Sequence, residues 1–250
     1  MRSAPAPGAT PPAIAGGEDA ARWVRGMFAR VARRYDLLNH LLSFNLDRYW
    51  RARAVRRLRP VLARPGAQVA DLCCGTGDLM LALAAAARGG RVYGSDFCHP
   101  MLAEAARKAA RKRAPIGLIE ADALALPLAA GSLDLLTMAF GLRNLANYAQ
   151  ALSEMRRVLK PGGVAAILEF SAPRNRVFAA IYAFYSRRIL PAVGGAVSGD
   201  PEAYRYLPES MRKFPAPDQL AEMMRAAGFI AVRYERMTAG IVALHTGTAE

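Results

Sequence analysis

The strongest constraint on the fold is a regular alternation between short apolar runs and longer amphipathic segments over residues 68–170. Five short runs are apolar enough to be strands buried on both faces: 68–73, 91–95, 116–121, 133–140 and 164–170. Three segments between them carry apolar residues at helical spacing: 79–88, 100–113 and 149–159. Strands that alternate with helices predict an α/β fold, in which a mostly parallel sheet has helices on both faces.

The segments outside this alternation predict how the chain is divided. Residues 1–19 are mostly proline, alanine and glycine, which is typical of a disordered tail. Residues 20–64 have apolar positions at helical spacing and predict a helical N-terminal lid. Residues 65–250 then form the main domain. Its later parts are a helical insertion at 171–212, a helix at 218–227, and two final strands at 229–236 and 240–245.

The composition excludes several classes of protein. No apolar stretch reaches the roughly 18 residues that a membrane-spanning helix needs, and the N-terminus lacks the basic and apolar regions of a secretory signal. Two of the three cysteines, Cys73 and Cys74, are adjacent, which gives neither a disulfide framework nor a zinc-binding spacing. His40, His99 and His245 also lack the spacing of metal ligands. We therefore predict a cytoplasmic protein without a metal site.

The positive charge is concentrated near the N-terminus. The whole chain has a formal net charge of +14, and residues 20–64 contain twelve arginines against only Asp36 and Asp47. Clustered cations bind the phosphates of nucleic acid or the anionic face of a membrane. They also occur on solvated helix faces without a partner, and arginine supplies 30 of the 34 basic residues throughout the chain. The charge alone leaves these interpretations open.

The stretch "VADLCCGTGDLML" (69–81) indicates a cofactor site, because a buried strand runs through Gly75-Thr76-Gly77 directly into a helix. Glycines at this turn let the backbone approach a ligand closely. A dinucleotide fingerprint would have glycine where Met80 stands, and Asp78 would repel a pyrophosphate. S-Adenosylmethionine has no phosphate, and its ammonium and sulfonium charges are attracted to carboxylates such as Asp71 and Asp78.

Two further acids follow the next two strands. Asp96 ends "RVYGSD" about 20 residues after the glycines, where an acid in this fold accepts hydrogen bonds from ribose hydroxyls. Asp122 follows the third strand, where its carboxylate can accept from an adenine amino group while the backbone of Ala123 contacts the ring edge. Each acid alone is as easily a turn or helix cap. Together with the glycines, the acids favour a binding site for S-adenosylmethionine.

The apolar strand at 133–140 ends in "FGLRNL" (140–145), and the change from apolar residues to an arginine and an asparagine indicates a substrate site. Ligands of open α/β sheets bind at the carboxyl ends of the strands. Arg143 and Asn144 therefore face a substrate in one interpretation. In the other, Arg143 forms an ion pair at the sheet edge and Asn144 caps the following helix.

Several stretches of the chain match one enzyme family. "MFARVARRYDLLNHLLSFNLDRYWR" (27–51) and "FGLRNL" are narrow signatures, whereas "VADLCCGTGDL" (69–79) and "RVLKPGG" (157–163) occur across many methyltransferases. Further matches are "LEFSAP" (168–173), "YRYLPESMRKFP" (204–215) and "AGFIAVRYERMTAGIVALHTG" (227–247). Over about residues 24–247 the chain resembles the C-methyltransferases of demethylmenaquinone and ubiquinone biosynthesis, within the class I S-adenosylmethionine-dependent methyltransferases.

The resemblance implies a Rossmann-like fold with a seven-stranded sheet whose last strand is antiparallel. It implies that S-adenosylmethionine is the co-substrate, with contacts at Thr76, Asp96, Asp122 and Ala123. It also implies transfer of a methyl group to a ring carbon of a prenylated hydroquinone, foremost demethylmenaquinol to menaquinol. The corresponding benzoquinol of ubiquinone biosynthesis is the alternative, and the sequence does not separate the two.

Methylation of a ring carbon needs the carbon held in line with the methyl group, a stabilised phenolate and a proton acceptor. Arg143 and Asn144 suit the first two tasks, although a guanidinium that stays protonated is a poor base. From the predicted lid, Tyr35 would orient the hydroxyl, Asp36 would accept the proton and Asn39 would hold the ring. Each of these three is equally consistent with an ordinary helix or turn residue.

The composition of the insertion predicts how a prenylated substrate reaches the enzyme. Residues 176–197 are apolar and aromatic but interrupted by Arg187 and Arg188. We expect a hydrophobic lid or channel for a prenyl tail which, with the basic residues 20–64, rests on the anionic inner face of the plasma membrane. The alternative is a helical cover packed on the sheet. An RNA-binding methyltransferase is a remote rival and no nucleic acid partner is expected, while a homodimer is left open.

Overall fold

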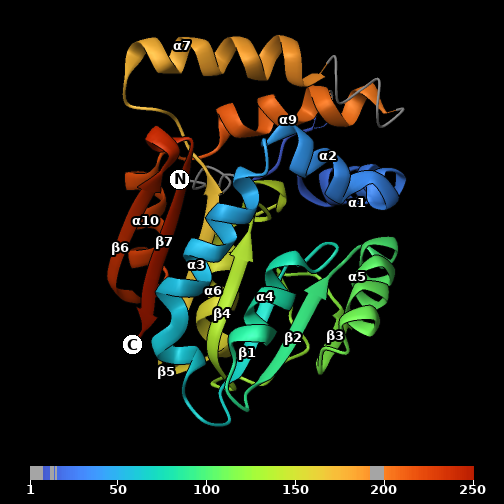
Figure 1. Ribbon diagram of the computed structural model, residues 1–250. Helices are drawn as coiled ribbons and strands as arrows, with labels where there is room; N and C mark the ends of the chain where they lie inside the picture. The colour runs from blue at the N-terminus through green and yellow to red at the C-terminus, as the bar shows by residue number, and fades with distance from the viewer. Residues whose placement is uncertain (1–7, 12–13, 15, 192–199) are drawn as a thin grey trace.

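A seven-stranded sheet lies at the centre of the computed structural model, which describes residues 8–11, 14, 16–191 and 200–250 (Figure 1). The strand order is β3-β2-β1-β4-β5-β7-β6. The strands are β1 (Gln68–Leu72), β2 (Arg91–Asp96), β3 (Ile116–Glu120), β4 (Leu133–Ala139), β5 (Leu159–Phe170), β6 (Phe229–Met237) and β7 (Val242–Ala249). β7 pairs antiparallel with both β5 and β6, and the strands from β1 to β5 pair in parallel. The predicted fold class is confirmed.

The middle strands are apolar throughout because both faces of the sheet are covered. Leu135 in β4 packs with one cluster of buried residues, and its neighbours Leu136 and Met138 pack with the cluster on the opposite face. None of these three side chains has any exposed surface. Side chains that alternate between the faces of a strand therefore find an apolar environment at every position.

Different helices of the described residues cover the two faces of the sheet. One face carries α3 (Leu46–Leu62), α4 (Asp78–Ala86) and α5 (His99–Lys112), whose buried residues share one cluster with the strands. The other face carries α6 (Tyr148–Val158) and α10 (Pro217–Ala226). Helices on both faces confirm the predicted layers.

The position of α3 differs from the sequence prediction, which assigned all of residues 20–64 to a lid. α3 buries Trp50, Ala54, Leu58 and Leu62 against the sheet, so it belongs to the main body of the protein. Helical spacing predicted the helix correctly, but it does not specify which surface the apolar face meets. The part that covers the sheet edge is shorter: α1 (Gly17–Val31), the 3₁₀ turn η1 (Ala32–Arg34) and α2 (Tyr35–Leu42).

Part of the predicted N-terminal tail contacts the body of the protein. Residues 1–7, 12, 13 and 15 of that tail lie outside the described residues. Ala9 is buried and its N–H donates to the carbonyl of Leu145 over 2.7 Å. α1 begins at Gly17, within the segment predicted as tail.

The insertion forms a second helical layer at the carboxyl ends of the parallel strands. It contains α7 (Arg176–Phe184), a π-helical turn η3 (Tyr185–Ile189) and α9 (Pro201–Lys213). Figure 1 shows α7 lying over α9, with α1 and α2 beside α9. Val24, Met27 and Leu38 of the lid share a buried cluster with Tyr204 and Tyr206 of α9. The predicted apolar stretch 176–197 is helical as far as residue 191, and residues 192–197 lie outside the described part.

None of the described helices is long and apolar enough to cross a membrane.

Candidate active site

The turn between β1 and α4 brings the backbone into an unusual conformation. Cys73, Gly75 and Gly77 all have positive φ, at 49°, 55° and 86°. A Cβ at position 77 would lie 2.7 Å from Cε of Met80 and 3.2 Å from Cβ of Ala105. Glycine is therefore required at position 77 both by the left-handed backbone and by the close approach of α4 and α5.

Asp71 and Asp96 lie at the carboxyl ends of β1 and β2, as the sequence predicted. Both carboxyls are buried and hydrogen-bonded. Asp71 accepts from the Thr137 hydroxyl at 2.6 Å, and Asp96 accepts from the backbone N–H groups of Gly75 and Cys98, each at 2.9 Å. Burial raises the pKa of Asp71 to about 7 and also raises the pKa of Asp96, outweighing the hydrogen bonds that favour the charged forms.

Asp122 and Ala123 follow β3 at the same sheet edge. Asp122 is exposed, and its carboxylate accepts from the N–H of Leu124 at 2.8 Å, so in this structure it caps a turn. Ala123 is buried. The pKa of the Cys73 thiol lies well above its usual value. Burial is the largest cause, and the charges of Asp96, Asp71 and Asp122 raise the pKa further. All three acids therefore lie close enough to Cys73 to act on its charge.

Arg143 is held in a buried ion pair. It lies in the 3₁₀ turn η2 (Leu142–Asn144) after β4, and its Nη1 donates to Oε1 of Glu169 at 2.8 Å. The same nitrogen donates to the carbonyl of Phe140, and the guanidinium lies 5.2 Å from the centre of the Phe170 ring. Burial opposes the charge, but Glu169 and then Tyr35 outweigh it, so the pKa of Arg143 is raised. Arg143 stays protonated.

Sequence reasoning did not identify Glu169, although the motif "LEFSAP" contains it. Glu169 has 1% of its surface exposed and follows the apolar run 164–168 as the second-last residue of β5. Its carboxylate also accepts from the backbone N–H groups of Arg143 and Phe170, at 3.3 and 2.8 Å. A lone acid at the end of a buried apolar run was the available signal.

Asn144 does not cap the following helix, because Asn147 does so by accepting from the N–H of Gln150 at 3.0 Å. The side chain of Asn144 is buried; its Nδ2 donates to the carbonyl of Phe140 at 3.3 Å and its Oδ1 accepts from the Tyr206 hydroxyl at 3.1 Å. Tyr206 comes from α9, within the matched stretch 204–215, and was not identified from the sequence. The N-cap interpretation of Asn144 is wrong.

The lid residues divide between two sides of the site. Tyr35 and Asn39 line the middle cavity together with Arg143, and burial raises the pKa of Tyr35 more than Arg143 and Asn39 lower it. Asp36 faces the glycine turn instead, where its Oδ1 accepts from the Thr76 hydroxyl at 2.5 Å.

Lys108 of α5 joins the lid to the glycine turn. Its Nζ donates to Oδ2 of Asp36 at 2.7 Å and to Asp78 at the start of α4, and it lies 3.4 Å from the Thr76 hydroxyl. The Lys108 side chain has 14% of its surface exposed. Sequence reasoning missed this residue, because nothing in α5 itself marks one lysine among several basic residues.

One group of described side chains has the proximity of metal ligands: His40, Asp47 and Asp78. Cations of the protein already pair with its carboxylates. Arg51 forms an ion pair with Asp47, and its Nη1 lies 3.8 Å from Oδ2 of Asp78. Lys108 forms an ion pair with Asp78 as well. The contacts indicate a salt-bridge network, and the absence of a metal remains a prediction.

Three cavities follow one another from the glycine turn to the surface. The innermost, of about 40 Å³, is lined by Gly75, Asp96, Tyr35 and Asn144 among others. Tyr35 and Asn144 also line the next, of about 50 Å³, which reaches Arg143. Asn39 then lines both that cavity and an apolar one of about 360 Å³.

The outer apolar cavity lies between α2, α7 and β5. Its walls are almost entirely apolar or aromatic: Leu42, Phe44, Leu46, Trp50, Phe170, Phe178, Ile181, Tyr182, Tyr185, Leu190, Leu207, Met211 and Ile241. The cavities thus lead from Gly75 and Asp96, whose cavity also has aromatic and apolar walls, past Arg143 and Asn144 to the outer apolar cavity, which is called the apolar channel below.

The raised pKa of Asp71 predicts a pH dependence of stability. The carboxyl has a pKa of about 7 when folded and about 3.8 as a free side chain, so between these values the folded protein holds a proton that the unfolded chain has released. Stability must then fall as pH rises through this window, by up to about 1.4 kcal/mol per unit. Asp71→Asn keeps an acceptor for the Thr137 hydroxyl but cannot titrate.

Urea unfolding of both proteins between about pH 4 and pH 8 measures this effect. The free energy of unfolding of the wild type, relative to Asp71→Asn, is expected to decrease up to about pH 7 and to level off above it. A difference that stays constant over the whole range would contradict the raised pKa.

Comparison with known proteins agrees with the fold and with the sequence resemblance. A model of the ubiE/COQ5 methyltransferase family matches residues 16–249. A demethylmenaquinone methyltransferase of Thermus thermophilus is 51% identical over 221 residues, which cover 88% of this chain and 99% of the relative. A ubiquinone/menaquinone biosynthesis C-methyltransferase of Syntrophotalea carbinolica is 47% identical over 223 residues, which cover 89% and 92%.

Among solved structures, a SAM-dependent methyltransferase from Thermotoga maritima superimposes with a TM-score of 0.62, covering 91% of this chain and all of that one. Its sequence identity of 19% makes this a likeness of fold. The predicted enzyme class is confirmed by the family match. With the family model spanning nearly all of the sequence and relatives near 50% identical along almost their full lengths, the chain belongs to the ubiE/COQ5 methyltransferase family.

Proposed function

We propose that this protein transfers a methyl group from S-adenosylmethionine to a ring carbon of a prenylated hydroquinone, converting demethylmenaquinol to menaquinol. The observation that carries the proposal is the series of cavities. Its inner end lies at Asp96 and the glycine turn, where a cofactor would bind, its middle at Arg143 suits an ionisable ring, and its outer apolar part suits an isoprenoid chain. Two relatives, 51% and 44% identical, are named demethylmenaquinone methyltransferases, which favours demethylmenaquinol over the benzoquinol of ubiquinone biosynthesis, whereas a third, 47% identical, is named for both pathways.

The cofactor would be held by the glycine turn and the acids around it. Gly75 and Gly77 let the backbone approach, and Asp71 with Thr76 would accept or donate hydrogen bonds to the amino acid part. Asp96 would bind the ribose hydroxyls. Asp122 and Ala123 would contact the adenine from the end of β3. The buried carboxylates also attract the positive charges of the cofactor, which lowers the cost of ionising them.

The reacting ring would lie near Arg143 and Asn144. A permanently charged guanidinium stabilises a developing phenolate, and the Glu169 pair fixes its position before substrate arrives. Asn144, oriented by the Tyr206 hydroxyl, would hydrogen-bond a ring oxygen. From the lid, Tyr35 would orient the hydroxyl group and Asn39 would hold the ring edge.

Asp36 is the proposed acceptor of the ring proton, directly or through water. Its present partners, Thr76 and Lys108, place it on the cofactor side of the lid. Because the lid helix α2 carries Tyr35, Asp36 and Asn39 together, closure of α2 would complete the site in one movement.

The prenyl tail would occupy the outer apolar cavity and leave toward a membrane. Leu37, Leu41 and Phe44 near α2, and Val177 and Phe184 on α7, are large apolar residues with more than 45% of their surface exposed. We propose that these two groups touch the anionic inner face of the plasma membrane, as a peripheral contact of a cytoplasmic enzyme. The RNA-binding alternative is less well supported, because Trp23 and Phe28 pack against Tyr206 and Tyr35 rather than facing outward.

Methyl transfer from labelled S-adenosylmethionine tests the function directly. We expect methylated product from demethylmenaquinol that is kept reduced and little product from the oxidised quinone, because only the quinol has an ionisable ring hydroxyl. A demethylated ubiquinol precursor is the parallel substrate. Product from the benzoquinol alone would assign the enzyme to ubiquinone synthesis, and transfer to neither would overturn the quinone assignment.

Lys108→Met is expected to loosen the lid. Without the ammonium, two charge-assisted hydrogen bonds to Asp36 and Asp78 are lost, and each such bond contributes about 1.5 to 3 kcal/mol. Hydrogen exchange in residues 35–42 should accelerate on the order of tenfold, and the KM for S-adenosylmethionine should rise. Lys108→Arg should restore much of both. Lys112→Met, at an exposed lysine of the same helix, is the control, and unchanged exchange in α2 of Lys108→Met would contradict the role.

Ile181→Asp tests the tail channel. Ile181 lines the outer cavity and has 60% of its surface exposed, so a carboxylate is tolerated there by the fold but disfavours an isoprenoid chain. The KM for long-tailed demethylmenaquinol should rise by about tenfold, while that for a tail-free analogue stays the same. Ile230→Asp, on β6 and 48% exposed, should change neither KM. Equal losses with both substrates would exclude a tail-specific role.

A further inference from the structure

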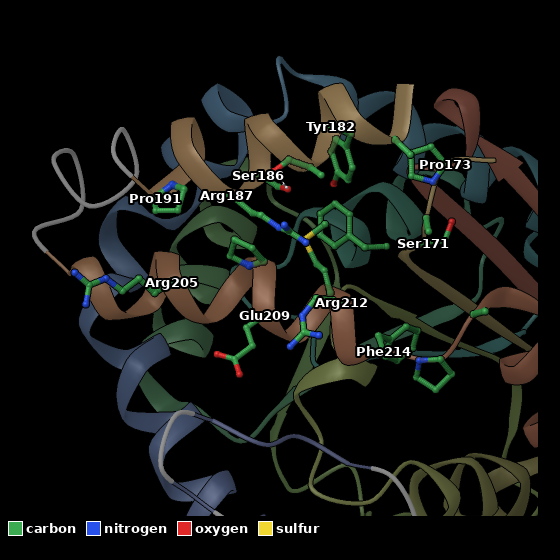
Figure 2. Close-up of a pocket in the computed structure, with 18 of the residues that line it drawn as sticks. Ser171, Pro173, Tyr182, Ser186, Arg187, Pro191, Arg205, Glu209, Arg212 and Phe214 are labelled. Carbon is green, nitrogen blue, oxygen red and sulfur yellow. Dashed lines mark hydrogen bonds between the residues drawn. The ribbon is translucent and has the colours of Figure 1, made fainter. Parts of the chain in front are cut away.

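A second groove lies on the other side of Tyr182 and Met211 from the apolar channel. It has a volume of about 760 Å³ and runs between α7 with η3 on one side and α9 on the other. Its walls include Ala179, Tyr182, Ala183, Met211 and Phe214, so the inner surface is largely apolar (Figure 2). Tyr182 and Met211 also line the channel, and they form part of the partition between the two spaces.

Three arginines are among the residues that line this largely apolar groove. Figure 2 shows Arg187 directed from η3 toward α9, and Arg205 and Arg212 projecting from α9 at the outer edge. Arg205 and Arg212 are seven residues apart, two helical turns, and therefore lie on the same face of α9. All three are exposed.

The three guanidinium groups are not neutralised by the protein. Within the described ranges, none of them has a hydrogen-bond or ion-pair partner. Glu209 is the one acid in the groove, and it pairs with Lys213 at 2.7 Å. Arg53 and Arg57 contrast with these three, because both pair with Glu235. The groove therefore combines an apolar floor with an uncompensated positive rim.

We propose that this groove binds the phosphate headgroup of an anionic phospholipid, with the first part of an acyl chain on the apolar floor. Guanidinium groups recognise phosphate through paired N–H donors. The exposed apolar residues Val177 and Phe184 lie on the same helix, α7, that forms one wall of the groove. If they enter the acyl region of a bilayer, the arginines lie at the depth of the headgroups.

The site would fix the orientation of the enzyme on the membrane. A headgroup held in the groove places the apolar channel, which lies across Tyr182 and Met211 along the same helix, against the acyl chains from which a prenylated substrate must come. The inference deepens the proposed membrane contact and rests on it for the location of the enzyme, but binding of a single lipid molecule to the groove is testable without a membrane.

The test uses the full chain and the triple variant Arg187→Gln, Arg205→Gln, Arg212→Gln. The matched control is Arg88→Gln, Arg91→Gln, Arg111→Gln, which removes the same charge from exposed arginines at the opposite ends of the strands and helices. Calorimetry measures binding of monomeric dioctanoyl phosphatidylglycerol, dioctanoyl phosphatidylcholine and inorganic phosphate. Flotation with phosphatidylcholine vesicles, with and without phosphatidylglycerol, measures membrane binding.

We expect the groove variant to bind dioctanoyl phosphatidylglycerol about a hundredfold more weakly, because each basic side chain contributes about a fivefold gain toward an anionic lipid. The control variant should bind as the wild type does. Methyl transfer to a tail-free quinol should be unchanged in both variants. If the wild type transfers no methyl group, the proposed reaction fails, whether or not the groove binds the lipid.

Three outcomes would overturn the site. Equal losses in both triple variants would mean that net charge, and not the groove, attracts the lipid. Binding of inorganic phosphate as tight as that of the lipid would assign the arginines to a free anion. Equal affinity for the zwitterionic and anionic lipids would remove the headgroup recognition. Wild-type binding to the short lipid without binding to vesicles would keep the groove and contradict the membrane contact.

Discussion

The buried ion pair between Arg143 and Glu169 is the interaction on which the rest of the site depends. A carboxylate with 1% exposure at the end of an apolar strand is stable only with a paired cation and hydrogen bonds, and Glu169 has both. In turn, Glu169 holds the guanidinium beside Phe140 and Phe170 at the carboxyl end of the sheet. Removing either partner would leave a single charge in a nearly dry environment, so the pair constrains both the packing of β4 on β5 and the electrostatics of the substrate site.

The lid completes the site from two directions with one short helix. Tyr35 and Asn39 face Arg143 and the middle cavity, and Asp36 faces Thr76 and Lys108. Consecutive residues of a helix point about 100° apart, so an eight-residue helix can contact a cofactor and a substrate at once. The same helix presents Leu37 and Leu41 to solvent. The proposed contact with a membrane and the proposed assembly of the site would thereby depend on one element.

Sequence periodicity predicted the sheet, its helices and the acids Asp71 and Asp96, because these follow from local spacing and from strand ends meeting at one edge. It could not predict Lys108 or Tyr206, whose roles arise only when α5 and α9 pack beside residues far away in the chain. α3 was assigned to the lid because helical spacing does not identify the surface that the helix covers. The ion-pair interpretation of Arg143 is confirmed, and its substrate role, which the ion pair does not exclude, stays a prediction.

The packing of the lid against α9 has a consequence for how the chain is made. Val24, Met27 and Leu38 are synthesised early, whereas Tyr204 and Tyr206, which share their buried cluster, leave the ribosome some 170 residues later. Until α9 has been synthesised, the amphipathic lid helices can pack only on earlier members of their cluster, such as Cys98 and Met101. The sheet from β1 to β5 can form in that interval, but the lid still lacks the part of its packing surface that α9 supplies. Completion of the candidate site is therefore postponed until α9 has been made, whatever the order in which its helices first appear.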